Sequence, residues 1–122
     1  MNEKLAINLF YVFAAAIWGA TACLWYMLWF FNPYTGYGEI TAPSTAMFLM
    51  AILALFSCHS HNAKHLIILA TISFLPIGLY LLATPGIFAL IGVLNLTSLA
   101  LGALIAAIGE PVAAYDCQQE NK

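Results

Sequence analysis

The sequence predicts an all-α fold: a polytopic integral membrane protein whose four transmembrane helices form an up-and-down bundle. Between Leu5 and Gly109 only Glu39 and Lys64 carry charge, and the chain contains no arginine. Three charge-free stretches result, namely 5–38, 40–63 and 65–109. A stretch of about 18 or more apolar residues without charge is typical of a membrane-spanning helix. Hydrophobic residues make up 64% of the chain and charged residues 7%, against roughly 25% charged residues in soluble domains.

The first half of the chain contains two of the four predicted spans. The first is predicted over 5–31 and ends before Pro33, because proline disfavours helical geometry in the residue that precedes it. The second is predicted over 44–58. Thr41 or Ser44 is expected to cap it, since a hydroxyl side chain can accept from the free amides of a first turn.

The longest charge-free run exceeds the length of one span and contains its own turn. Thr84-Pro85-Gly86 is a turn signal that divides the run into spans over 65–83 and 87–109. Pro76 lies in the middle of the first of these spans and is expected to kink it. Glu110-Pro111 is expected to end the last span and to leave a short polar tail.

The orientation follows from the lysines. Four spans bring both termini and the loop between the second and third spans to one side, and Lys4, Lys64 and Lys122 all fall there. Lysine is enriched in cytoplasmic loops, so we expect a multi-pass protein of the bacterial inner (plasma) membrane with both termini in the cytoplasm. A single domain over 1–122 is predicted, because the length leaves no room for a separate soluble one.

Aromatic residues gather at the outer end of the first span. Trp25 and Trp29 lie near the end of this span, and Tyr34 and Tyr37 lie in the loop that follows. Amphipathic rings are enriched at the headgroup level of a bilayer, so these four residues are expected to form an interfacial belt. The alternative is an aromatic cage that binds a ligand at the outer face.

Two stripes of small residues recur at four-residue spacing, which places their members on one face of a helix. They are Ala15, Gly19 and Cys23 in the first span, and Ser98, Gly102 and Ala106 in the fourth. Small residues let helix backbones approach closely in lipid. We expect the stripes to seat spans one and four against neighbours inside the bundle. The alternative is that one stripe forms an interface between subunits.

Asn95 lies near the middle of the fourth span, where its amide cannot reach water. We expect it to form an interhelical hydrogen bond, which in membranes contributes about 0.6 kcal/mol on average. The functional alternative is an amide that lines a pore or contacts a substrate.

A local cluster of metal-ligand side chains lies between the second and third spans. Its members are Cys58, His59, His61 and His65. Thiolate and imidazole suit zinc and other transition metals. However, Lys64 beside them would oppose a cation, and the spacing matches no established zinc pattern. The main interpretation is therefore a structural polar turn, with a metal site and a pH sensor as alternatives.

Several functional classes are not expected. Glu39 and Glu110 fall on opposite sides of the membrane in this topology, so they cannot act as a paired acid and base. No nucleophile lies beside a base, so we do not expect an enzyme. Three lysines cannot neutralise many phosphates, which argues against nucleic acid as a partner.

The sequence therefore favours a structural or accessory subunit, an interaction protein of the bilayer. It is expected to assemble with copies of itself or with a larger membrane protein, and it is expected to need no cofactor. The first alternative is an oligomeric pore or transporter for a small neutral solute. The second is a metal-binding membrane protein that uses the inner loop over 58–65.

Overall fold

This computed structural model describes residues 2–32 and 41–120, apart from the side chains at 110–117 and 120. The described helices are α1 (Glu3–Phe30), α2 (Ala42–His59), α3 (Ala63–Ser73), the π-helical turn η1 (Phe74–Gly78), α4 (Leu79–Leu82) and α5 (Ile87–Glu120). Four helical stretches among the described residues are long and apolar enough to cross a membrane: α1, α2, the continuous α3–η1–α4 and the first part of α5, Ile87–Gly109. The predicted all-α, four-span fold is confirmed.

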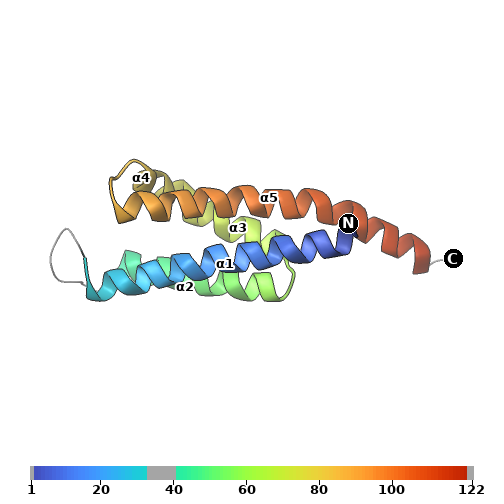
Figure 1. The fold of residues 1–122 in the computed structure, drawn as a ribbon, viewed down its shortest axis with the longest axis horizontal. Coiled ribbons are helices and arrows are strands. Elements are labelled where there is room, and N and C mark those ends of the chain that lie inside the picture. Colours follow the sequence, from blue (N-terminus) through green and yellow to red (C-terminus); the bar gives the residue numbers. More distant parts are fainter. Residues whose placement is uncertain (1, 33–40, 121–122) are drawn as a thin grey trace.

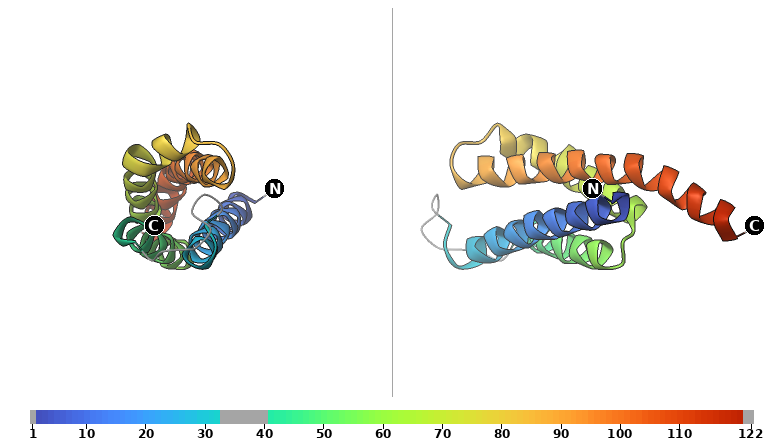
Figure 2. Two further views of the ribbon diagram at one scale, coloured as in Figure 1. Left: turned by 90° about the vertical axis from the view of Figure 1, so that its left-hand side faces the viewer. Right: turned by 45° about the vertical axis from the view of Figure 1, so that its right-hand side comes forward.

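The four spans form a ring in which each contacts two neighbours. Helix α1 contacts α2 and α5, and α3 likewise contacts α2 and α5; Figure 2 shows this ring from one end. Both chain ends and the α2–α3 turn lie at the same end of the bundle (Figure 1). The short connections over 60–62 and 83–86 make consecutive spans antiparallel, which gives the up-and-down order.

The start of α2 is fixed by a reciprocal cap. The Ser44 amide donates to Thr41 Oγ1 at 3.4 Å, and the Thr41 amide donates to Ser44 Oγ at 3.1 Å. Trp29 Nε1 of α1 donates to the same Ser44 Oγ at 3.0 Å, which ties the end of α1 to the start of α2. Because capping begins at Thr41, the second span covers 18 residues and is longer than the predicted 44–58.

The expected distortion at Pro76 takes the form of a single π-helical turn. The Leu79 amide donates to the carbonyl of Phe74, five residues earlier, instead of four residues earlier as in an α-helix. Proline has no amide hydrogen, and its ring collides with the carbonyl four residues before it in a regular helix. The wider turn accommodates Pro76 without ending the span.

Glu110-Pro111 marks the end of the last apolar span, as predicted, but it does not mark the end of the helix. The apolar part of α5 does stop at Gly109, but the helix continues to Glu120, and its last turns extend past the rest of the bundle (Figure 1). A proline removes one helical hydrogen bond. The carbonyl that Pro111 leaves without a partner is that of Ala107, in the last turn of the apolar span. The loss of this one bond so close to the end of the span does not oblige the helix to end.

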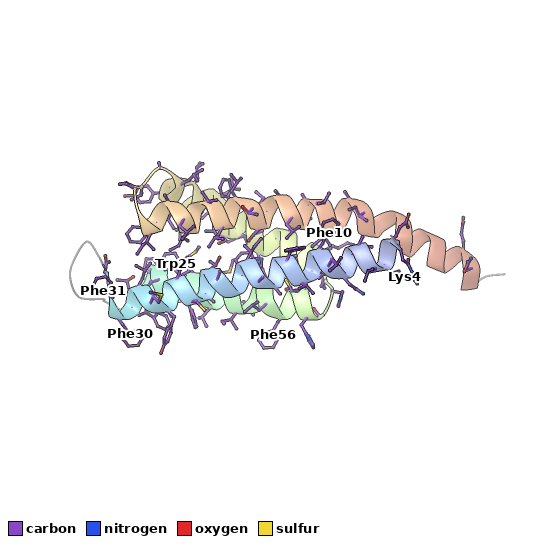
Figure 3. All side chains as sticks on the ribbon, in the orientation of Figure 1. Lys4, Phe10, Trp25, Phe30, Phe31 and Phe56 are labelled. Carbon is purple, nitrogen blue, oxygen red and sulfur yellow. The ribbon has the colours of Figure 1, made fainter. Side chains whose placement is uncertain are left out.

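Trp25 does not join an interfacial belt, which corrects a second expectation. It is 6% exposed and lies in a core cluster with Met47 of α2 and Ile91 of α5, and Figure 3 shows its side chain between α1 and α5. Trp25 lies seven residues after Trp18 on α1. Trp18 is fully buried and belongs to a different core cluster from that of Trp25. Two helical turns separate them, so both point inward. Tyr34 and Tyr37 lie outside the described residues.

Helix α5 approaches the third span closely at Gly92. A Cβ atom added there would lie 2.5 Å from the Leu82 nitrogen and 3.0 Å from the Gly78 carbonyl oxygen. Both are backbone atoms, so no side-chain rotation could relieve the overlap. Glycine at this position is therefore what allows the two backbones to meet.

Replacing Gly92 with alanine is expected to destabilise the bundle by about 1–3 kcal/mol, because helix α5 must move away from α4. The matched control is Gly109→Ala, since no described atom lies within 4 Å of a Cβ at that position. Thermal unfolding of both variants in a mild detergent checks this. Equal midpoints for the two variants would contradict it.

Candidate functional site

The interior of the bundle contains six buried polar side chains among the described residues: Thr21, Ser44, Ser57, Ser73, Asn95 and Ser98. The hydroxyls of Thr21 and Ser57 donate to carbonyl oxygens of their own helices at 2.9 and 3.1 Å, so they need no partner from another helix. Ser44 is used in the cap of α2. The remaining three belong to the third and fourth spans, which contact each other.

Asn95 and Ser73 form a hydrogen bond between α5 and α3. Ser73 Oγ donates to Asn95 Oδ1 across 3.2 Å, and neither residue is more than 1% exposed. The structure thus places Asn95 in a contact between helices. The same bond leaves the Asn95 amide nitrogen without a partner among the described atoms.

Gly78, the last residue of the π-helical turn, makes room for the Asn95 side chain. A Cβ atom at Gly78 would lie 3.2 Å from both Cβ and Nδ2 of Asn95, and 3.1 Å from the Phe74 ring. The π-helical turn, the close contact at Gly92 and the buried amide therefore lie together. Single π turns in α-helices are frequent at functional sites, which makes this junction the candidate site in the interior.

Four buried polar atoms in the described part of the bundle have no hydrogen-bond partner: Trp18 Nε1, Trp25 Nε1, Asn95 Nδ2 and Ser98 Oγ. The three nitrogens can only donate, whereas the hydroxyl can donate or accept. A buried donor left unpaired costs about 1–3 kcal/mol. The described interior therefore holds three donor nitrogens and one hydroxyl that lack a partner from the protein.

The two small-residue stripes have different surroundings. Ser98 is 1% exposed, and a Cβ at Gly102 would contact Ile67 of α3 at 3.4 Å, so the stripe that ends at Ala106 begins inside the bundle. In contrast, no described atom lies within 4 Å of a Cβ at Gly19, and Cys23 is exposed. Internal packing thus describes the stripe on α5. On α1 it describes Ala15, which packs against the core, but not Gly19 or Cys23.

Gly19 and Cys23 line an apolar hollow of about 500 Å³ on the outer surface between α1 and α2. The rest of its lining includes Tyr26 of α1 with Phe48 and Leu55 of α2. We call this hollow the α1–α2 groove. Ala15, the first member of the stripe, lies outside it and contributes to a different hollow near the lysine-bearing end.

The structure distributes the four suggested metal ligands over two hollows. Cys58 is buried and His61 is exposed, and both line a hollow with Tyr11, whose ring lies 4.6 Å from that of His61. His65 lines a separate hollow between α2 and α3, and His59 contributes to both. Within the described residues, no group of three or more His, Cys, Asp or Glu side chains could hold a metal ion.

Sequence reasoning did not identify Gly78, Gly92 or Trp18 as parts of this interior, and it assigned Trp25 to the membrane interface. Pro76 and Gly78 within a hydrophobic span were the available signal for a break in regular helix geometry. The role of Gly92 has no local signal, since it depends on how closely α4 approaches. Glu39 lies outside the described residues, and the structure does not describe the side chain of Glu110.

Comparison of the chain with protein-family models, with curated proteins and with solved structures gives no match. The functional argument therefore rests on the chemistry and geometry of the residues themselves.

A double-mutant cycle on Ser73→Ala and Asn95→Leu is expected to give a coupling free energy of about 0.6 kcal/mol, because each substitution removes one partner of the interhelical bond. Unfolding free energies of the two single variants and the double variant measure it. The control cycle pairs Ser73→Ala with Thr97→Val, because the Thr97 hydroxyl bonds only within α5, to the Val93 carbonyl. A coupling no larger than that of the control would contradict the assignment.

Proposed function

We propose that this chain is an accessory or structural subunit of the membrane, which binds a transmembrane helix of a partner protein in the α1–α2 groove. The observation that carries the proposal is the open position at Gly19. The groove is apolar, and Gly19 lets a backbone approach within van der Waals distance of α1. In lipid, close contact of this kind is what favours helix association, because apolar area alone gives no advantage over lipid tails.

The other glycines of the spans support this choice by contrast. Gly78, Gly92 and Gly102 each have atoms of a neighbouring helix close to the Cβ position. Gly109, which is open like Gly19, lies at the end of the apolar part of α5 rather than within it. Gly19 is thus a mid-span glycine with no internal packing role in the described structure, although alanine would be the better helix former at that position.

The proposal includes the orientation inferred from the lysines, with both termini in the cytoplasm and the α1–α2 groove facing the lipid of the inner membrane. Lys4 and Lys64 lie at the same end of the bundle, which also carries both termini. The measurement uses two reporters fused to the C-terminus. The reporter that is active only in the cytoplasm is expected to be active, and the reporter that is active only outside it is expected to be inactive.

Replacing Gly19 with leucine is expected to lower the recovered complex about tenfold, which corresponds to about 1.4 kcal/mol. The leucine side chain would fill the groove, and the bundle itself would be unaffected because the Cβ position is open. Native mass spectrometry of protein extracted gently from its own membrane measures the complex and its stoichiometry.

The matched control is Ala20→Leu, which adds the same side chain to an exposed position on α1 outside the groove lining. This variant is expected to retain its partner. Equal recovery of the complex from both variants would overturn the proposal. A complex that contains only copies of this chain would identify the partner helix as its own.

A path for a small neutral solute is the second candidate, and the unpaired donors of the interior favour it. Trp18, Asn95 and Ser98 offer hydrogen bonds that such a solute could accept or share. Under this candidate, liposomes that contain the purified chain show flux of a small neutral solute, and Asn95→Leu reduces the flux several-fold. Liposomes with no flux above the protein-free control would exclude it.

A further inference from the structure

A second groove, between α2 and α3, changes from polar to apolar along its length. It encloses about 460 Å³, within the range of roughly 300–1,000 Å³ that is typical of small-molecule sites. Its polar lining includes His59, Ser60 and His65, which flank the α2–α3 turn. The remainder includes Leu53 and Phe56 of α2 and Ile68 of α3.

The apolar part extends from the polar rim into the membrane. Leu53 lies six residues before His59 on α2, which corresponds to a distance of about 9 Å along the helix. Phe56 is 67% exposed, and its side chain points away from the bundle in Figure 3. An occupant that fits both parts must have a polar end at the membrane surface and an apolar end within the lipid.

The side chains at and beside the polar rim indicate which chemical group the polar end of the occupant carries. Lys64 precedes His65 in the first turn of α3, and the lining residues of the groove include no acid. Each imidazole ring carries an N–H group that can donate a hydrogen bond. Together with the Ser60 hydroxyl they form a set of donors suited to a phosphate group.

From this juxtaposition we propose that the α2–α3 groove binds an anionic glycerophospholipid. The phosphate contacts His59, Ser60 and His65, and one acyl chain lies along Leu53, Phe56 and Ile68. This site is separate from the α1–α2 groove and does not rest on the proposed function. It also does not depend on the orientation of the chain, because phosphate lies at the headgroup level of both leaflets.

His61 provides a matched control within the same turn. Its backbone adopts a left-handed conformation with φ of 52°, which is uncommon for a residue other than glycine. This conformation accompanies a ring that is tilted by 60° against the Tyr11 ring of α1 and that lines the other hollow. Substitution of His61 therefore tests for a general effect of removing a histidine from this turn, whereas substitutions of His59 and His65 test the groove itself.

The experiment is a lipid titration of the full-length chain in detergent, followed by native mass spectrometry. The probes are phosphatidylglycerol and phosphatidylcholine with the same acyl chains. The wild-type chain is expected to bind phosphatidylglycerol at least tenfold more tightly. The double variant His59→Ala/His65→Ala, which removes both ring donors of the groove, is expected to lose this preference, and His61→Ala is expected to keep it. Equal binding of the two lipids by the wild-type chain, or equal losses in the two variants, would overturn the proposal.

Two further measurements separate a lipid from other ligands of the same residues. Leu53 is exposed, so Leu53→Trp should block the site of the acyl chain and weaken the binding of both lipids at least tenfold. Displacement of phosphatidylglycerol by equimolar glycerol 3-phosphate would identify a free phosphate site, and loss of lipid binding on addition of a chelator would identify a metal site. Either result would overturn the lipid assignment.

Discussion

The close approach of α5 to the third span is the constraint on which the rest of the bundle depends. Two glycine positions, Gly78 and Gly92, bring the backbones together, and the bond from Ser73 to Asn95 fixes how they face each other. Because van der Waals contact replaces the hydrophobic effect inside a membrane, such close contact has to come from small residues. The ring is closed by α1, which contacts both α2 and α5.

Much of the fold could be predicted from the sequence, because the signals involved are local. The absence of charge marks the spans, Thr84-Pro85-Gly86 marks the last turn, and Thr41 marks the start of α2. The course of α5 beyond Pro111 could not be predicted in this way. A proline weakens a helix by an amount that its surroundings can offset, and the sequence does not reveal those surroundings.

The candidate sites were harder to predict, because they depend on which face of each helix is covered. Both stripes have the same spacing, yet one begins inside the bundle at Ser98 and the other includes the open position at Gly19. The aromatic residues near the end of α1 were likewise predicted to lie at the headgroup level of the bilayer, whereas Trp25 is part of the core. Spacing defines a face, but only the packing of the other spans determines what that face contacts.

The continuous course of α5 gives the chain a rigid arm outside the membrane. From Gly109 to Glu120 the helix adds eleven residues, a projection of about 16 Å. Since this arm and the fourth span are one element, any tilt of α5 within the lipid moves its outer end through a larger arc.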